Sequence, residues 1–220
     1  MNSSLSRKNT LNRIATALRE STGIPFADED GFHSIFTPDQ KDLGARFAHE
    51  FTIHEGKVFF CSGKKELFNH LKALVELKKW TNISCETTVL LKGFHLERLP
   101  FINKGSMCEA DAGITDCECL VARTGTVVLT AAQSSGRVLP VRVPVHIVIA
   151  NVNQLVFDIG QAIDRIKEKF PDRLPSALFF ASGPSRTGDI ERTLVVGVHG
   201  PREVYVFLMN DNDLANERIQ

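Results

Sequence analysis

Residues 182–201, SGPSRTGDIERTLVVGVHGP, gather polar side chains of several kinds around one short apolar segment. Arg186 can hold a carboxylate or a phosphate through the planar fork of its guanidinium, and Asp189 is an acceptor that can orient that fork. The same stretch supplies three hydroxyl groups, those of Ser182, Ser185 and Thr187. These residue types predict an anion-binding loop over residues 183–189. The alternative is a connector in which the polar groups cap a turn and the arginine is solvated.

Residues 123–129, RTGTVVL, form a second polar loop. Gly125 stands between Thr124 and Thr126, directly before an apolar run. Glycine permits a backbone turn that other residues avoid, and it leaves amides open to an anion. Gly183 offers the same property in the first loop. An anion site requires the two loops to meet, and otherwise Gly125 marks a tight turn between strands.

Two histidines stand in or beside apolar runs. His199 follows one such run directly before a Gly-Pro pair. It is a candidate acid–base group or anion donor, the alternative being a ring bonded to nearby backbone. His146 lies within an apolar run and is predicted to be a buried, hydrogen-bonded histidine. The chain has no Gly-x-Ser-x-Gly, His-Glu-x-x-His, Walker or Gly-x-Gly-x-x-Gly motif, so several common enzyme classes are disfavoured.

The overall composition restricts the partners. Lys plus Arg equals Asp plus Glu at 26 each over 220 residues, so no global field attracts nucleic acid or an anionic membrane. The first residues lack the apolar stretch of a signal peptide, and the apolar runs are too short to cross a bilayer. We therefore predict a cytoplasmic protein with no nucleic-acid partner and no membrane insertion.

The five cysteines predict reduced thiols, because an odd count without a secretory signal argues against a disulfide framework. Cys117 and Cys119 are two residues apart, which in a strand places them on one face. This spacing differs from that of paired zinc or iron–sulfur ligands. We interpret the thiols as small buried side chains and expect neither a metal nor another cofactor.

The positions of these groups depend on the surrounding elements. Apolar periodicity predicts helices over residues 4–21, 39–50, 64–80 and 154–170. It predicts strands over residues 55–62, 81–86, 143–151, 176–182, 193–201 and 203–210, and two extended segments within 113–131 that are broken at Thr124-Gly125. Residues 86–96 fit either structure.

Continuous apolar strands that alternate with amphipathic helices predict an α/β sheet covered on both faces. The short link between the last two strands predicts an antiparallel pair at one edge of this sheet. The loop at 183–189 would follow the carboxyl end of a strand, where open α/β sheets hold ligands. Residues 1–38 are predicted to be a helix and an arm, and residues 39–215 one α/β domain.

Four segments together resemble the LUD-domain family, and within it the lactate utilisation protein C group. They are TGTVVL (124–129), LPVRVPVHIVIAN (139–151), GPSRTGDIE (183–191) and GVHGP (197–201). The resemblance covers roughly residues 100–210. It implies a three-layer α/β fold with a mixed, mostly parallel sheet, like that of the superfamily of sugar-phosphate isomerases, CoA-transferases and formyltetrahydrofolate cyclo-ligases.

The resemblance also implies a role in a bacterial three-protein system that oxidises L-lactate to pyruvate, with iron–sulfur proteins as the other two members. Arg123 departs from the family, which often has Glu before Thr-Gly-Thr, and this exchange alters the charge that the loop tolerates. Our leading hypothesis is a crevice for a small anion between residues 124–126 and 183–189. In it Arg186 would hold the anion and His199 would act as catalyst or donor.

Two other hypotheses remain. One is a stand-alone enzyme that uses the superfamily crevice for a phosphorylated sugar, a CoA ester or a folate. The other is a non-catalytic assembly subunit. Whether the protein is an enzyme in its own right, and in which oligomeric state it acts, does not follow from the residues.

Overall fold

The computed structural model describes residues 3–17, 19, 42–96, 99, 102–103, 109–133, 139–188 and 194–210. The chain divides into two compact units, Met1–Asp39 and Gln40–Gln220. In the first unit the described element is helix α1, Ser3–Ala17, which agrees with the predicted helix as far as Ala17. The predicted arm at 25–38 lies outside the described residues. All further elements belong to the second unit.

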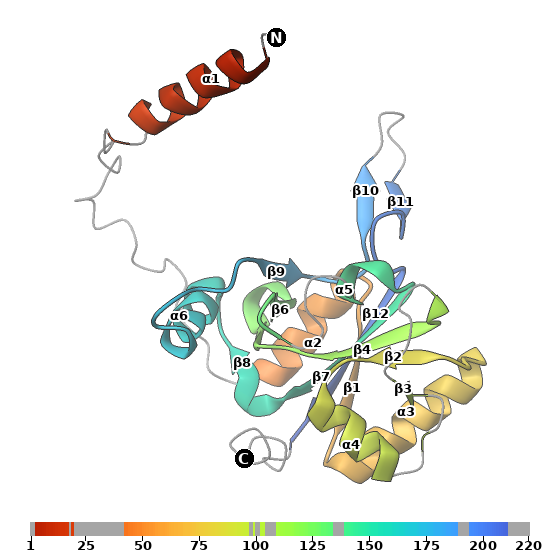
Figure 1. The fold of residues 1–220 in the computed structure, drawn as a ribbon. Helices are drawn as coiled ribbons and strands as arrows, with labels where there is room; N and C mark the ends of the chain where they lie inside the picture. The colour runs from red at the N-terminus through yellow and green to blue at the C-terminus, as the bar shows by residue number, and fades with distance from the viewer. Residues whose placement is uncertain are drawn as a thin grey trace. The chain divides into compact units, whose positions relative to one another are not determined.

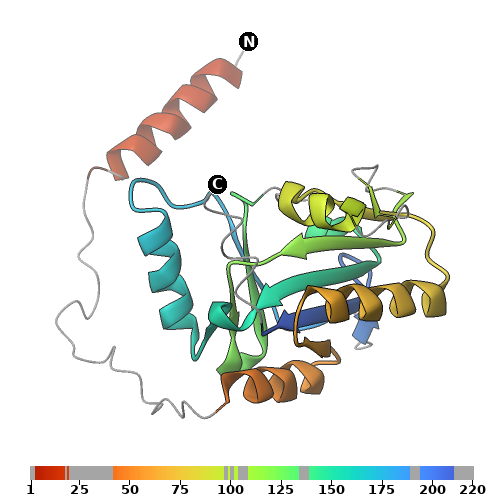
Figure 2. The ribbon, with the colours of Figure 1, turned by 90° about the horizontal axis from the view of Figure 1, so that it is seen from below.

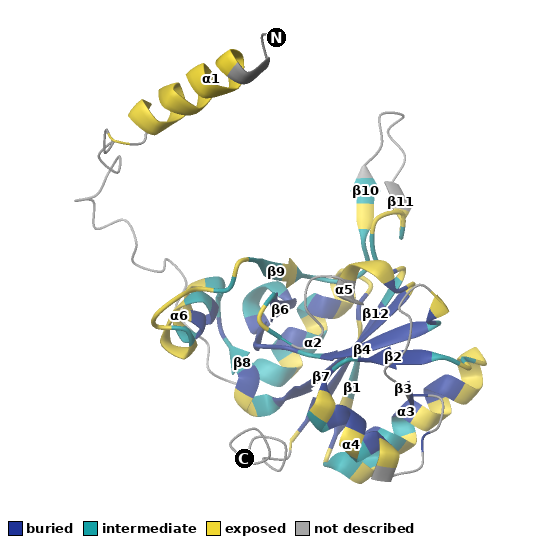
Figure 3. Cartoon of the chain, in the orientation of Figure 1, coloured by how far each residue is buried: buried dark blue, intermediate teal, exposed yellow. Residues whose placement is uncertain are grey.

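The central element of the second unit is a six-stranded sheet in which every pair of neighbours is parallel (Figure 1). In spatial order its strands are β1 (Lys57–Cys61), β12 (Glu203–Met209), β7 (Val145–Asn151), β4 (Ala112–Asp116), β2 (Ile83–Cys85) and β3 (Ile102–Asn103). The inner strands are the most deeply buried part of the unit (Figure 3). The predicted mixed α/β architecture with a mostly parallel central sheet is confirmed.

The two faces of this sheet carry different apolar clusters, because successive side chains of a strand point to opposite sides. On β7, Ile147 and Ile149 pack with the buried residues of helices α3 (Lys64–Lys78) and α4 (Thr88–Leu96). Val148 and Ala150, between and after them, pack on the other face with helix α2 (Leu43–Ile53). The near-continuous apolar sequence of β7 follows from this burial on both sides.

A second sheet of four strands covers the same face as α2. Its order is β8 (Leu155–Val156), β5 (Cys119–Val121), β6 (Thr126–Thr130) and β9 (Leu178–Ala181). β6 is antiparallel to both β5 and β9, whereas β5 and β8 are parallel. Helix α6 (Ile159–Lys169) packs on the outer side of this sheet through Ala162 and Ile166 (Figure 2).

The predicted antiparallel pair formed by the last two strands is wrong. β11 (Leu194–Val196) pairs instead with β10 (Arg186–Gly188) in a hairpin that projects from the unit (Figure 1). β12 lies inside the main sheet, parallel to both β1 and β7. Every residue of β12 after Glu203 is buried, and only a strand covered on both faces can bury such a sequence.

Three element boundaries also differ from the prediction. Residues 113–131 form three strands rather than two, because the chain turns after β4 and a 3₁₀ turn, Ala122–Thr124, separates β5 from β6. Helix α2 begins at Leu43, where Asp42 accepts a hydrogen bond from the Ala45 N–H at 3.0 Å. Helix α6 begins only at Ile159, since residues 152–156 form a 3₁₀ turn and strand β8.

Two further segments show how tertiary position changes a prediction. The strand predicted at 55–62 to be buried is β1, an edge strand whose Lys57 and Phe60 are exposed. Residues 86–96, which fitted either structure, contain helix α4. Among the described helices, none combines the length and the apolar character that a membrane crossing requires.

The four described cysteines are buried and unbridged, whereas Cys108 lies outside the described residues. Burial raises the pKa of the Cys85 thiol to about 12. The prediction that Cys117 and Cys119 share a face is wrong: Cys117 packs in the cluster around α2, and Cys119 packs in the cluster around α6. The reason is that Cys117 lies in the turn between β4 and β5 rather than in a strand. No group of three or more potential metal ligands occurs among the described residues.

Candidate functional site

The two predicted polar loops meet. Thr126 Oγ1 lies 2.7 Å from Ser182 Oγ and 2.7 Å from Thr124 Oγ1, so three hydroxyl groups form a continuous hydrogen-bonded row. The antiparallel pairing of β6 with β9 produces this contact, because it sets the beginning of β6 beside the end of β9.

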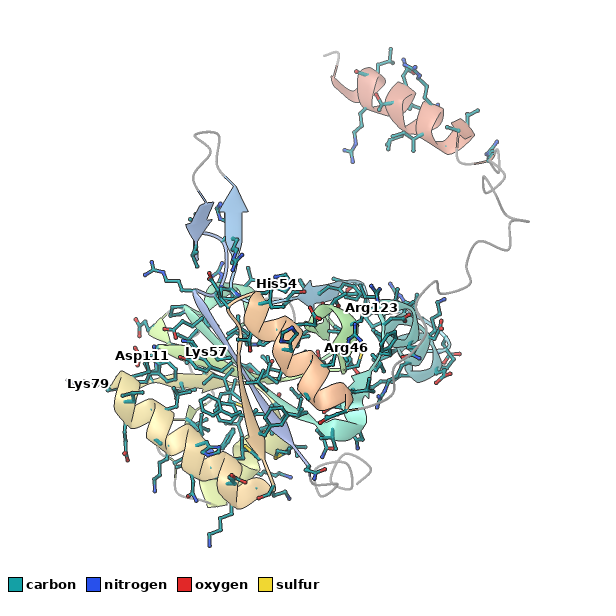
Figure 4. The ribbon with its side chains drawn as sticks, turned by 180° about the vertical axis from the view of Figure 1, so that it is seen from behind. Arg46, His54, Lys57, Lys79, Asp111 and Arg123 are labelled. Carbon is teal, nitrogen blue, oxygen red and sulfur yellow. The ribbon has the colours of Figure 1, made fainter. Side chains whose placement is uncertain are left out.

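The carboxyl end of helix α2 and the following residue His54 pack against glycines of both loops. Gly125 has φ +56°, and a Cβ atom there would come within 2.3 Å of the Phe51 backbone nitrogen. Gly183 has φ +125°, and its Cβ would come within 2.4 Å of the His54 carbonyl oxygen. Figure 4 shows His54 at this end of α2. Both glycines therefore allow close approach of α2 itself, a packing role that the sequence interpretation did not include.

A cleft of about 570 Å³ opens at the base of the hairpin. It brings together four of the predicted residues, Gly183, Ser185, Arg186 and His199. Residues that the sequence interpretation did not place in a site also line it, among them His54, Val141 and Phe180, and so does His146. Val141 comes from the short helix α5, Leu139–Arg142.

The other described residues of the predicted site do not line the cleft. Thr124, Gly125 and Thr126 do not line the cleft, although Thr126 is hydrogen-bonded to Ser182, which does; Thr187 is the middle residue of β10. Asp189 lies outside the described residues. The cleft is thus lined by residues of the 183–189 loop, by His54 after α2 and by the hairpin base, whereas Thr124, Gly125 and Thr126 of the other loop do not line it.

The cleft lies at the amino ends of the main-sheet strands, since His146 and Val204 are the second residues of β7 and β12. The predicted carboxyl-end location holds only for β9, which belongs to the second sheet. A different cavity, of about 650 Å³, lies at the carboxyl ends of β1 and β12. Its lining includes the carboxylates of Asp42 and Glu66 but no Lys, Arg or His, so an anion is favoured in the hairpin cleft.

Backbone hydrogen bonds hold the hairpin base in place. Ser185 donates its N–H to the Pro201 carbonyl at 2.8 Å, and Gly197 donates to the Ser185 carbonyl at 2.9 Å. Gly200 lies so close that an added Cβ would be 2.8 Å from the Ser185 Cβ. These contacts bring exposed His199 to the same cleft as Ser185.

Arg186 forms an ion pair with Glu55, with 3.2 Å between Nη2 and Oε2. Glu55 comes from the turn after α2 and adopts a left-handed conformation with φ +65°. Among the described residues, the carboxylate that pairs with this guanidinium is therefore that of Glu55, whereas the predicted partner Asp189 lies outside them. The sequence offers no pattern that marks Glu55. Its positive φ, which is uncommon for a residue other than glycine, identifies the turn only in the structure.

His146 is the buried histidine that its sequence position predicted. Its Nε2 lies 2.9 Å from Thr115 Oγ1 on the neighbouring strand β4. Burial lowers its pKa to about 4, so the ring is uncharged near neutral pH. It contributes a polar but neutral surface to the inner end of the cleft.

We expect the His146→Gln substitution to flatten the pH dependence of the free energy of unfolding between pH 6.5 and pH 4. In that interval the imidazole of the unfolded protein becomes protonated, whereas the buried imidazole of the folded protein remains neutral. The stability of the wild type therefore falls as pH decreases, by at most about 1.4 kcal/mol per pH unit from this residue. Urea titrations across the interval measure the slope.

His95→Gln is the matched control, because the His95 side chain is exposed on α4. Its stability should keep the slope of the wild type. A His146→Gln protein whose slope equals that of the wild type would show that the buried ring does not resist protonation.

Arg123, the residue that departs from the family pattern, does not line the cleft. Its backbone N–H donates to the Phe157 carbonyl at 2.9 Å, and its side chain is half-buried. The exchange of charge at this position therefore does not alter the groups that face the cleft directly.

Comparison with known proteins identifies the part of the chain that carries the cleft. Residues 103–209 match the family model of the LUD domain. These residues, just under half of the chain, are similar to the LUD domain family. The matched segment contains every residue that lines the hairpin cleft except His54. Helix α2 and its turn therefore lie outside the matched segment, and from this region His54 lines the cleft.

Curated relatives agree with this assignment. The chain is 38% identical over 105 residues to "Lactate utilization protein C" of Bacillus velezensis, covering 47% of this chain and 44% of that protein. It is 36% identical over 105 residues to the protein of the same name from Bacillus subtilis, with the same coverage. An uncharacterised protein of Neisseria meningitidis is 35% identical over 97 residues, or 44% of this chain and 41% of its own. The matches thus span less than half the length of these relatives.

A solved structure supports the fold. The crystal structure of a DUF162 family protein from Deinococcus radiodurans superposes with a TM-score of 0.60 at 17% sequence identity. The superposition covers 79% of this chain and 100% of that one. At this identity the similarity establishes the α/β architecture.

Proposed function

We propose that this protein is a cytoplasmic subunit of a bacterial system that oxidises L-lactate to pyruvate, and that it binds a small anion in the hairpin cleft. The proposal is carried by the similarity of its LUD domain to proteins named lactate utilization protein C. The reaction, the compartment and iron–sulfur proteins as partners are inferences from that similarity.

The groups in the cleft support a binding role. Arg186 is a permanent cation that faces an opening about 570 Å³ in volume. Ser182, hydrogen-bonded to Thr126, offers a hydroxyl beside it, and the Gly183 backbone follows. In this arrangement Arg186 binds the anion and the hydroxyl row orients it. Exposed His199 is the proposed proton donor or acceptor at the outer end of the cleft.

Deletion of the gene, followed by growth on L-lactate as the sole carbon source, tests the physiological assignment. We expect growth on L-lactate to stop and growth on pyruvate to continue, because the lost step precedes pyruvate. The intact gene should restore growth, and a gene that encodes the Arg186→Ala protein should not. Undiminished growth of the deletion strain on L-lactate would contradict the assignment.

A further inference from the structure

Glu55 occupies the position at which an anion would meet Arg186. Its Oε2 atom lies 3.2 Å from Nη2 of Arg186, and both Arg186 and the preceding residue His54 line the hairpin cleft. Carboxylates are the natural partners of a guanidinium, and the fork geometry accepts any carboxylate of suitable size. The protein thus already holds one carboxylate on the arginine to which the proposed anion would bind.

The position of Glu55 is determined by the backbone around it. Glu55 donates its N–H to the Thr52 carbonyl and Gly56 donates to the Phe51 carbonyl, both at 2.9 Å. A Cβ atom on Gly56 would lie 2.2 Å from the Phe51 ring, so the chain must pass directly over that ring. Glu55 consequently adopts φ +65°, a conformation in which glycine or asparagine is usual after a helix. The backbone conformation of the turn therefore does not favour a glutamate. The contact that the structure shows for the Glu55 side chain is its ion pair with Arg186.

The Glu55–Arg186 pair is one that a ligand can displace. The two side chains retain 64% and 36% of their exposure, and exposed pairs of this kind contribute little net stability. A ligand carboxylate that replaces Glu55 recovers the same interaction and releases the glutamate to water. The turn itself need not move, because its hydrogen bonds are made by the backbone.

The permanent charge around the cleft favours a ligand with a single negative charge. Arg186 is the permanent cation among the lining residues, and His146 is neutral because it is buried. A dianion would leave one charge without compensation and would face the carboxylate of Glu55 nearby.

We propose that Glu55 is an internal competitor that makes the cleft selective for a small monocarboxylate, which binds Arg186 in its place. This inference rests on the proposed anion site and adds the chemical class of its ligand. Glu55 is a specificity-determining residue in this scheme, and it does not itself take part in a reaction.

Isothermal titration of the full-length protein with L-lactate, pyruvate and inorganic phosphate tests the proposal. Glu55→Gln keeps the length of the side chain but removes the competing charge. We expect it to raise the affinity for the two monocarboxylates about three- to tenfold at low ionic strength. Glu50→Gln removes the same charge from α2 without touching the Glu55–Arg186 pair, and should leave the affinity at the wild-type value.

The double variant Glu55→Gln/Arg186→Ala should lose the whole gain, since the competitor acts only through the arginine. Monocarboxylate binding that is lost in Arg186→Ala but unchanged in Glu55→Gln would overturn the role of Glu55 while upholding the anion site. Equal binding to the wild type and to Arg186→Ala would overturn the site itself. Phosphate that binds the wild type more tightly than either monocarboxylate would overturn the proposed ligand class.

Discussion

The Gly125→Ala substitution is expected to lower the free energy of unfolding by about 3 to 5 kcal/mol, a loss as large as the total stability of a marginal domain. Gly125 adopts φ +56°, a left-handed conformation that costs alanine about 1 to 2 kcal/mol. The new methyl carbon would also lie 2.3 Å from the Phe51 backbone nitrogen. Because that atom belongs to helix backbone, it cannot turn aside as a side chain would.

The displacement would spread from α2 to the cleft. Helix α2 would have to move away from the 3₁₀ turn before β6, and its Phe47 and Phe51 side chains are both fully buried. The turn that carries Glu55 would move with it. We therefore expect Gly125→Ala to reduce ligand binding as well as stability, although residue 125 does not line the cleft.

Gly93→Ala is the matched control for this prediction. Gly93 lies within α4, and the nearest atom to an added Cβ is the Phe68 Cζ at 3.8 Å, an ordinary contact. Alanine in a helix interior is favoured over glycine by about 0.5 to 1 kcal/mol, so this variant should be slightly more stable than the wild type. Urea unfolding followed by circular dichroism measures both variants. A Gly125→Ala protein as stable as the wild type would contradict the prediction, because it would show that α2 can move away from residue 125 without loss of stability.

The Arg186→Ala substitution is expected to weaken binding of a small monocarboxylate about 10- to 100-fold, the loss of one charged hydrogen-bonding partner. Its thermal stability should change little, because the Glu55–Arg186 pair is exposed and pairs of this kind are worth under about 1 kcal/mol. The substitution is thus predicted to lower the affinity for the ligand without lowering the thermal stability. Titration calorimetry and thermal unfolding of the same preparation measure the two quantities.

Two further variants determine what the arginine supplies. Arg186→Lys keeps the charge but loses the planar fork, and should retain part of the affinity. Arg173→Ala removes an exposed arginine that does not line the cleft, so it controls for the general loss of positive charge. If Arg186→Ala lowered stability as much as binding, the arginine would have a structural role at the hairpin base.

Much of the fold could be predicted from local patterns. The helix at 64–78 follows from its apolar stripe, since Leu67, Leu71, Leu74 and Val75 are all buried on one side. The strand at 145–151 follows from a continuous apolar run, which burial on both faces requires. Patterns of this kind are set by residues within a few positions of one another. They therefore predict helices and strands such as these without knowledge of the rest of the chain.

The partner of each strand could not be predicted in the same way. β12 follows β11 closely in sequence, yet it pairs with β1 and β7, which lie far away along the chain. The sequence of an apolar strand does not specify which strands will pair with it, because every strand offers the same backbone hydrogen-bonding groups. The prediction therefore chose the nearest partner in sequence, and that choice was wrong.

The sequence by itself determined which groups are available for chemistry: one arginine among small hydroxyl residues, a histidine before a Gly-Pro pair, and glycines where the backbone turns. The meeting of the two polar loops was inferred from those groups, and in the structure Thr126 of one loop is hydrogen-bonded to Ser182, the residue before the other. The resemblance of residues 124–201 to LUD domains was likewise visible in the residues alone.

Only the tertiary structure decided how these groups are arranged. It placed the end of α2 against Gly125 and Gly183, gave both glycines a packing role, and set Glu55 against Arg186. Residues 55 and 186 are paired by the docking of a helix on two sheets, a contact that depends on the sum of many apolar interactions. No local signal specifies such a contact, because the energy that forms it comes from side chains throughout the core.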